Sequence, residues 1–293
     1  FYISLIFLSL SIAIKTNTNV LDVILFSSIF YLIIGFISNI TESIVLYKVY
    51  ETSTDRILDC LEIKEEIHKK SNFSSINKIS FKDVTYKIED NYLLKNVNLT
   101  IKKNEKLYIT GESGIGKSTM MKLLLKYYDL DKGKILIDNI NLNDLPLTFI
   151  RNNITYIGQN EQLFTSSILD NLKLITKDEN KIKEVCDISL VTNFLKKNNF
   201  SLDYHIEENA SNLSGGEKKK IVLARGLLHL KNVLILDEVF NEISIKEERI
   251  ILKNIMSKYQ DKIIIMISHR NSNTDLFTKK YQLKGDGKLY ETK

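Results

Sequence analysis

The sequence Gly111-Glu-Ser-Gly-Ile-Gly-Lys-Ser-Thr119 fits the pattern G-x-x-x-x-G-K-[ST]. In this pattern the glycines let the backbone approach an anion closely, and successive N–H groups point at its oxygens. Glu105–Thr110 before the loop predicts a strand, and Lys117 to about Tyr128 after it predicts a helix. Because a strand and a helix flank the loop, we interpret it as a phosphate-binding loop.

The residues of this loop have separate expected roles. Lys117 reaches the β and γ phosphates of a nucleotide, and Ser118 ligates Mg²⁺. The N-terminus of the helix adds a partial positive charge. The predicted nucleotide contacts are Gly111, Glu112, Ser113, Gly114, Ile115, Gly116, Lys117, Ser118 and Thr119.

Length and composition limit the classes of protein. A chain of 293 residues has room for about two domains. The net charge of +5 is mild and the charges are mixed in sign, so no nucleic-acid partner is expected. Cys60 and Cys186 have no metal-ligand spacing, and a reduced cytosolic setting fits them better than a disulfide framework.

Two apolar runs, Phe1–Ile14 and Val20–Ile40, begin the chain and are joined by the polar Lys15–Asn19. The second run is long enough to cross a bilayer core, and the first predicts a membrane helix cut off at its start. Two adjacent runs favour membrane helices over buried helices of a soluble domain. No basic segment precedes the first run, which argues against a signal peptide. We expect the C-terminal part of a longer protein.

The amphipathic segment Thr41–Lys70 follows, with more basic residues than the connection before it. The positive-inside rule therefore places it in the cytoplasm, and we expect a multi-pass protein of the cytoplasmic membrane. The predicted domains are residues 1–70, the end of a transmembrane domain; residues 71–78, a linker; and residues 79–293, a cytoplasmic domain.

Residues 79–293 have the pattern of a soluble α/β domain. The first two predicted strands, Ile79–Ile88 and Val97–Ile101, read as antiparallel. Later strands are predicted at Lys134–Asp138, Ile154–Gly158, Val233–Leu236 and Lys262–Ile267, with a terminal hairpin at Tyr281–Lys284 and Lys288–Glu291. Helices are predicted at Leu147–Asn152, through most of Glu161–Asn209, and at Ile243–Tyr259.

The run Leu234-Ile-Leu-Asp237-Glu238 has the form of a Walker B strand, which delivers two acids at its carboxyl end. Ligands bind at that edge in open α/β sheets. Asp237 is expected to hold the Mg²⁺ shell, and Glu238 is expected to polarise the attacking water.

Leu213-Ser-Gly-Gly-Glu217 adds a second helix N-terminus suited to an anion. Here the sequence resembles the ATP-binding cassette (ABC) family, and this stretch resembles its signature motif. In that family the signature of one subunit contacts the γ-phosphate bound by the other. The resemblance implies ATP and Mg²⁺ as cofactors, a second cassette as partner, most simply in a homodimer, and nucleotide contacts from Ser214, Gly215 and Gly216.

Two further positions match this family. Gln159, at the end of a predicted strand, is similar to the glutamine that senses Mg²⁺ and the transmembrane partner. His269 is similar to the histidine that contacts the γ-phosphate. The resemblance therefore implies Glu238, His269, Gln159 and Lys117 as catalytic residues, and Ser118, Gln159 and Asp237 as metal residues.

The resemblance also implies an architecture. It is that of a P-loop NTPase cassette with a parallel core sheet, an antiparallel β subdomain and a helical subdomain. The two apolar runs make the chain similar to exporters, in which transmembrane α-helices precede the cassette, and they resemble the fifth and sixth helices of such a domain. Membrane lipid is then a further partner.

Two positions depart from the family pattern. Ser244 stands where the family usually has an aspartate, and Ile88 stands where an aromatic usually stacks on adenine. We hypothesise that Tyr92 partly replaces that aromatic. The alternative is a site held mainly by phosphate contacts and tolerant of GTP.

The function implied is ATP hydrolysis that drives export. The stretches Phe240–Ile245 and His269–Phe277 are similar to bacteriocin-type peptide exporters, which makes a peptide the expected substrate. Lipid or drug export is the alternative. A soluble cassette acting on DNA or ribosomes fits less well, because the apolar runs have no role there, and Lys117, Glu238 and His269 together argue against a degenerate cassette.

Overall fold

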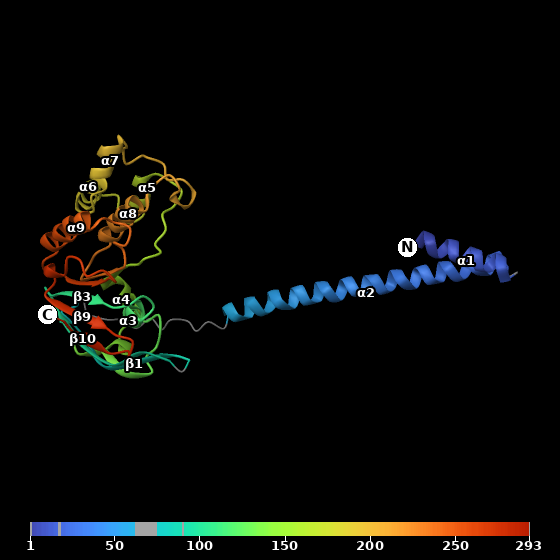
Figure 1. The fold of residues 1–293 in the computed structure, drawn as a ribbon, viewed down its shortest axis with the longest axis horizontal. Helices are drawn as coiled ribbons and strands as arrows, with labels where there is room; N and C mark the ends of the chain where they lie inside the picture. Colours follow the sequence, from blue (N-terminus) through green and yellow to red (C-terminus); the bar gives the residue numbers. More distant parts are fainter. Residues whose placement is uncertain (1, 17–18, 62–74, 90, 293) are drawn as a thin grey trace. The chain divides into compact units, whose positions relative to one another are not determined.

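The computed structural model describes residues 2–16, 19–61, 75–89 and 91–292. The chain divides into two compact units, Phe1–Glu66 and Ile67–Lys293, which we describe separately (Figure 1). The predicted boundary near residue 70 and the first part of the predicted linker lie outside the described residues. The three-part division of the chain therefore stays a prediction.

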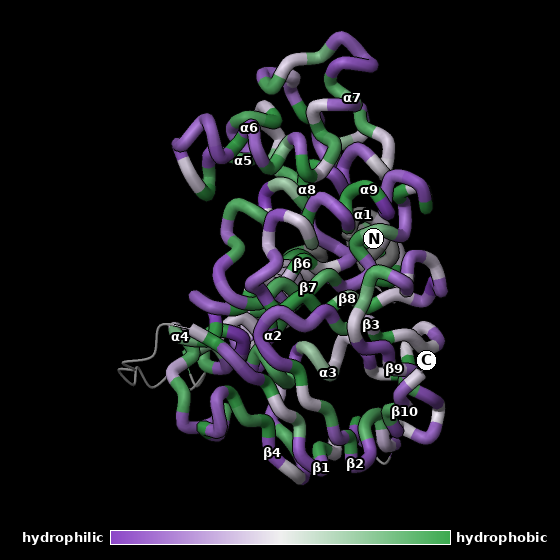
Figure 2. The backbone as a smooth tube through the Cα atoms, turned by 90° about the vertical axis from the view of Figure 1, so that its left-hand side faces the viewer, coloured by the Kyte–Doolittle hydropathy of each residue, from purple (hydrophilic) through white to green (hydrophobic). Residues whose placement is uncertain are grey.

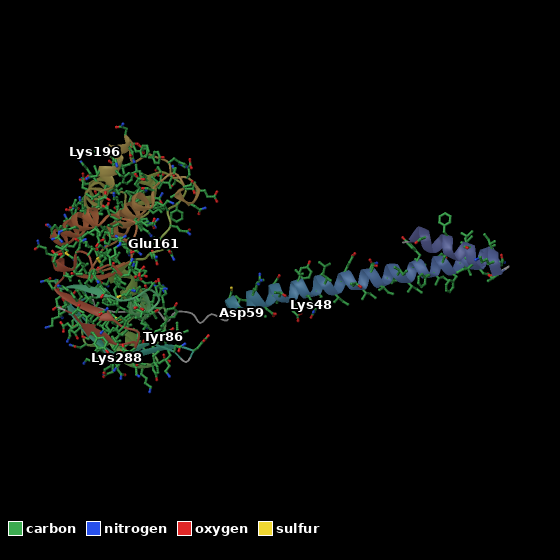
Figure 3. The ribbon with its side chains drawn as sticks, in the orientation of Figure 1. Lys48, Asp59, Tyr86, Glu161, Lys196 and Lys288 are labelled. Atoms are coloured by element: carbon green, nitrogen blue, oxygen red, sulfur yellow. The ribbon has the colours of Figure 1, made fainter. Side chains whose placement is uncertain are left out.

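The first unit consists of α1 (Tyr2–Thr16) and α2 (Val20–Leu61), and α1 lies back along α2 (Figure 1). Leu21–Leu61 is long and apolar enough to cross a membrane by length and composition, with a mean hydropathy of 2.2 in its best window. The helix does not stop at Ile40, where the apolar run ends. It continues into the polar part that carries Lys48 and Asp59 (Figure 3).

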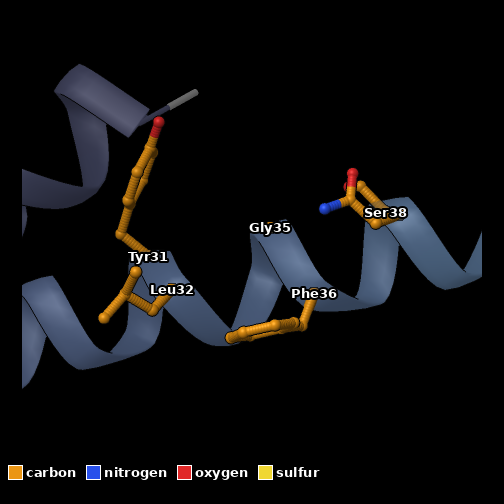
Figure 4. A pocket seen from close by; sticks show the side chains of 6 residues that line it. Tyr31, Leu32, Gly35, Phe36 and Ser38 are labelled. Carbon is orange, nitrogen blue, oxygen red and sulfur yellow. The ribbon is translucent and has the colours of Figure 1, made fainter.

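The exposed apolar face of α2 is interrupted by a small groove. Gly35 leaves the space beside it open, and a Cβ placed there would meet no atom within 4 Å. The groove is lined by Tyr31, Leu32, Gly35, Phe36, Ser38 and Asn39 (Figure 4). Apolar side chains exposed along a helix of this length are typical of a lipid-facing or helix-facing surface.

The second unit contains two sheets, as the sequence predicted. The antiparallel sheet has the order β2-β1-β4-β5, with β1 (Lys78–Ile88), β2 (Asn91–Lys102), β4 (Lys132–Ile137) and β5 (Ile140–Asn141). The larger sheet has the order β10-β9-β3-β8-β7-β6, with β3 (Lys106–Thr110), β6 (Ile154–Ile157), β7 (Val233–Asp237), β8 (Ile263–Ile267), β9 (Lys279–Leu283) and β10 (Leu289–Glu291). In it, β6, β7, β8, β3 and β9 run parallel, and β10 closes the edge as the antiparallel arm of the predicted hairpin.

Two hydrophobic cores lie on opposite faces of the larger sheet. Along β7, Leu234 and Leu236 face one core, whereas Val233 and Ile235 face the other. Side chains alternate across a strand, so strands buried on both faces read as continuous apolar runs. The apolar centre of the unit is visible around β6, β7 and β8 (Figure 2).

Helices cover both cores. The α-helices are α3 (Lys117–Leu124), α4 (Leu147–Asn153), α5 (Ile168–Lys173), α6 (Glu179–Ile188), α7 (Val191–Asn198), α8 (Gly215–Leu228) and α9 (Ile245–Lys258). Short 3₁₀ helices lie at Leu142–Asp144, Glu208–Ala210 and Thr274–Leu276. The core formed by α5 to α9 belongs to the helical subdomain and one sheet face, whereas α3, α4 and the antiparallel sheet share the other.

Several predicted boundaries were wrong. The helix after the phosphate loop ends at Leu124, and the stretch 161–209 contains three short helices separated by loops rather than a mostly helical run. Ser167 and Asp178 start two of those helices by accepting hydrogen bonds from backbone N–H groups, which fixes the breaks. The second antiparallel strand begins at Asn91, which pairs with Ile88, rather than at Val97.

Candidate functional site

The phosphate loop connects β3 to α3, as predicted. Gly114 and Gly116 have φ of 78° and 109°, in the left-handed region that favours glycine. Gly116 is the N-cap of α3 and offers no side-chain oxygen to the first turn. The N–H groups at this helix end therefore have no side-chain cap and are available to an anion.

Lys117 is the first residue of α3, and its side chain is 3% exposed. Its ammonium donates to the carbonyl oxygens of Gly111 at 2.9 Å and Glu112 at 2.6 Å. It also lies 3.8 Å from Glu238 Oε1. Burial lowers the pKa of Lys117, and the nearby Glu238 carboxylate opposes that shift. The ammonium thus joins the phosphate loop to the end of β7.

Strand order brings the predicted catalytic residues to one edge of the sheet. The phosphate loop follows β3, and His269 follows β8, which lies next to β3 in the sheet. Asp237 and Glu238 lie at the end of β7, the strand on the other side of β8. Gln159 follows β6, the next strand. Because these strands are parallel, their carboxyl ends meet where ligands bind in such sheets.

Asp237 is 2% exposed and is oriented by a tyrosine that the sequence did not point to. The Tyr156 hydroxyl, on β6, donates to Asp237 Oδ2 at 2.6 Å. Burial and then the Asp237 carboxylate raise the pKa of Tyr156 far above its ordinary range, so the phenol stays a proton donor. The sequence offered one hint of this contact: Tyr156 lies in the predicted strand that ends just before Gln159.

The other carboxylate oxygen of Asp237 fits a role toward a cation. Asp237 Oδ1 is buried and has no hydrogen-bond partner within the described part of the chain. An unpaired buried carboxylate oxygen is costly unless a cation or a donor completes it. Over the described residues, no group of three or more His, Cys, Asp or Glu side chains is arranged to hold a metal. A Mg²⁺ ion would therefore rely on Asp237, the Ser118 hydroxyl and the nucleotide phosphates.

Replacing Tyr156 by Phe is expected to weaken the response to Mg²⁺. Outer partners of metal ligands typically contribute about 10–100-fold to metal affinity, because they fix the orientation of the ligand. The Mg²⁺ concentration that gives half-maximal ATP turnover should rise accordingly. Tyr127→Phe, at an exposed position, is the matched control. An unchanged Mg²⁺ requirement in Tyr156→Phe would show that this hydrogen bond does not serve the metal.

Glu238 is held in an unusual backbone conformation. Its φ is 53°, which a residue with a side chain adopts only when its surroundings enforce it. Its N–H donates to Ile267 O at 3.0 Å, and Asn241 Nδ2 donates to its Oε2 at 3.0 Å. His269 Nδ1 lies 3.9 Å from the same Oε2. The carboxylate, the histidine and Lys117 thus form one cluster, and their catalytic roles stay predictions.

The signature residues lie apart from this cluster within the chain. Ser214 is the N-cap of α8 and forms a reciprocal capping pair with Glu217. Ser214, Gly215 and Gly216 line a groove with residues of α7 and α9, among them Phe194 and Glu247, and not with the phosphate loop. Their predicted contact with nucleotide therefore needs a second subunit.

The loop after β6 is attached to the signature helix. The Lys219 ammonium, on α8, donates to the backbone oxygen of Gln159. Arg225, further along α8, donates to Gln162 O at 2.8 Å and lies 3.4 Å from Glu161 Oε2 (Glu161 is labelled in Figure 3). These contacts join α8 to the loop that carries Gln159, whose role as a metal ligand stays a prediction.

The predicted adenine region lies on the hairpin of β1 and β2. Tyr86 is half-buried, packs against the core shared with the antiparallel sheet, and stacks on Tyr128 with ring centroids 5.8 Å apart. Ile88 and Tyr92 are exposed. The Lys87 ammonium lies 4.3 Å from the Tyr92 ring centroid, and Lys95 approaches the same ring at 5.2 Å. A base that stacks on Tyr92 must therefore share the ring with these cations.

The assignment of Tyr92 to adenine makes a measurable prediction. Stacking of a base on an aromatic ring contributes about 1–3 kcal/mol, or roughly 5- to 150-fold in affinity. Tyr92→Ala should weaken ATP binding by part of that range, and Ile88→Tyr should strengthen it. Titrations with ATP and GTP measure both effects. If Tyr92→Ala binds ATP like the parent protein, Tyr92 does not stack on the base.

Comparison with known proteins agrees with this geometry. The family model described as ABC transporter matches residues 94–241, from β2 to the residues after Glu238. The ATP-dependent lipid A-core flippase of Pasteurella multocida is 33% identical over 222 residues, 73% of this chain and 38% of that protein. The lactococcin-A transport/processing ATP-binding protein of Lactococcus lactis is 33% identical over 231 residues, 76% of this chain and 32% of that protein.

A solved structure shares the fold. The structure of a bacterial Atm1-family ABC exporter with ATP bound aligns with a TM-score of 0.73 and 23% identity, covering 84% of this chain and 46% of that one. This chain belongs to the ABC transporter family. The predicted fold class is confirmed, and so, at the level of the family, is the prediction of an ATPase. The chain spans less than two fifths of the length of the flippase and the lactococcin transporter.

Proposed function

We propose that this chain hydrolyses ATP to drive export of a substrate across the cytoplasmic membrane. The observation that carries the proposal is the cluster of Lys117, Asp237, Glu238 and His269 at the carboxyl edge of the parallel sheet. In this cluster Lys117 supplies a cation for the phosphates and Asp237 a carboxylate for a metal ion. Glu238 supplies a carboxylate for the attacking water, and His269 lies beside Glu238. These are the groups that phosphoryl transfer to water requires.

The residues act by positioning and electrostatics. Lys117 exchanges the two loop carbonyls for the β and γ phosphates, while the N–H groups of the loop surround the same oxygens. Ser118 and Asp237 would hold a Mg²⁺ ion, which would supply positive charge beside the phosphates. Glu238 accepts a proton from the attacking water, and Asn241 fixes the direction in which its carboxylate points.

The apolar first unit supports export, because a helix suited to span a membrane precedes the cassette. α2 passes the length and hydropathy test for a span, and relatives over the cassette include a lipid flippase and a lactococcin transporter by name. We propose a multi-pass membrane protein with the cassette in the cytoplasm and lipid around α1 and α2. The exported substrate we propose is a peptide.

A lipid is the second candidate substrate. Lipid A-core flippases match this chain over 73% of its length, nearly the share covered by the lactococcin transporter. Stimulation of ATP hydrolysis in vesicles decides between them. A secreted antimicrobial peptide should raise the turnover of the complete transporter, whereas stimulation by lipid A alone would favour the flippase.

The separation of the signature from the phosphate loop predicts that ATP bridges two copies. With hydrolysis blocked by Glu238→Gln, residues 75–293 should be monomeric without nucleotide and dimeric with ATP, because bound nucleotide supplies much of the interface. Light scattering measures the change. The matched control adds Lys117→Met, which should leave the protein monomeric. A stable dimer in the absence of nucleotide would contradict this arrangement.

A further inference from the structure

The residue that lies against the signature glycines is an acid, Glu242. A Cβ on Gly215 would lie 1.7 Å from Glu242 Oε2, and a Cβ on Gly216 would lie 2.9 Å from the Glu242 backbone oxygen. The carboxylate therefore occupies the place where a side chain on Gly215 would begin. Only glycine fits this contact without displacing Glu242.

This contact lies at the N-terminus of α8. The first N–H groups of a helix have no partner inside it, and the helix dipole favours negative charge there. Ser214 and Glu217 cap each other, so Glu217 N–H is occupied. Glu242 thus lies beside Gly215 and Gly216, the part of the helix N-terminus that is expected to bind phosphate.

The backbone on both sides of Glu242 is fixed. Phe240 and Ile243 are buried in the core. The Arg270 guanidinium donates to the backbone oxygen of Asn241, and also to Ile243 O at 2.9 Å. Arg270 in turn lies 3.6 Å from the fully buried Glu248. The approach of Glu242 to the glycines follows from this anchored loop rather than from a free side chain.

The groove also carries Lys197, Glu217, Lys220 and Glu247. Lys220 pairs with Glu247 at 2.5 Å, and Glu217 accepts from Asn198 at 2.8 Å as well as from Ser214. Among the described residues, Glu242 has no ion-pair partner. It therefore contributes an uncompensated negative charge to the surface that meets the second subunit's nucleotide.

We propose that Glu242 sets the affinity of this signature for the γ-phosphate, an inference that rests on the proposed function. Phosphate approaches Gly215 and Gly216 only when the carboxylate moves away, and the two negative charges repel each other. ATP-bridged closure of the dimer is then weaker than with a neutral residue. Because the effect is electrostatic, salt reduces it.

The experiment uses the full chain in detergent micelles with Glu238→Gln, so that hydrolysis plays no part. Energy transfer between dyes at the C-termini of two copies reports closure as ATP is added. Glu242→Gln should lower the ATP concentration for half-maximal closure about tenfold at low salt. The gain should shrink when salt is raised from about 0.05 to 0.5 M. Glu291→Gln, an exposed acid on β10, should change nothing.

Two results would overturn the inference. One is unchanged closure in Glu242→Gln. The other is a gain only in Glu242→Ala, which would show that bulk and not charge matters. Binding of a fluorescent ATP analogue to dilute monomer is measured separately. If the monomer fails to bind the analogue in every variant, the proposed function is wrong, because Glu242 is not part of the chain's own phosphate loop. If the monomer binds the analogue in every variant, the closure measurement tests the role of Glu242 alone.

Discussion

Replacing Glu238 by Gln is expected to reduce ATP turnover about 10²–10⁴-fold, the usual loss when one positioned base is removed. Gln keeps the shape of the side chain and an oxygen for Asn241, but it cannot accept a proton from water. Because the left-handed backbone at this position strains Glu and Gln alike, the fold should be unaffected. ATP binding should remain, since phosphate contacts come from the loop and Lys117.

The measurement is steady-state phosphate release, compared with ATP binding by titration. Asp144→Asn removes an exposed carboxylate outside the cluster and is the matched control. His269→Ala should also lower turnover strongly, because the imidazole lies beside the same carboxylate. Parental turnover in Glu238→Gln would mean that another group activates the water.

The phosphate loop and the end of β7 were predictable because each is a local pattern. Glycines at positive φ, and a lysine at the start of a helix, are fixed by residues adjacent in sequence. The buried strands β7 and β8 were predictable for a related reason, since short apolar runs bounded by polar residues fit strands that are buried on both faces of a parallel sheet. These two kinds of signal were enough to place Asp237 and Glu238 at the carboxyl end of a strand, whereas His269 was identified through the resemblance to the ABC family.

Contacts that depend on strand order were not predictable. Tyr156 reaches Asp237 only because β6 lies beside β7 in the sheet, although the two strands are far apart in sequence. The contacts of Lys219 with Gln159 and of Glu242 with Gly215 likewise join residues that are distant in sequence. A single sequence contains no measure of such proximity.

Replacing Lys117 by Met is expected to weaken ATP binding about 10–150-fold. The estimate follows from about 1.5–3 kcal/mol for a hydrogen bond that involves a charged group. Met has a similar volume and suits a position that is 3% exposed, so packing around α3 should be preserved. The ammonium that the loop carbonyls and Glu238 now share would be lost, and the phosphates would keep only backbone N–H donors.

Titration of ATP against the full chain measures this loss, with Lys122→Met on the same helix as the control. The carbonyls of Gly111 and Glu112 also lose their donor, so thermal unfolding without nucleotide should show only a modest decrease in stability, since Asn241 still holds Glu238. The key comparison is then the stabilisation that ATP gives each protein: large in the parent and the control, and nearly absent in Lys117→Met. Equal stabilisation in all three would mean that ATP binds without the phosphate loop, and the assignment of the site would be wrong.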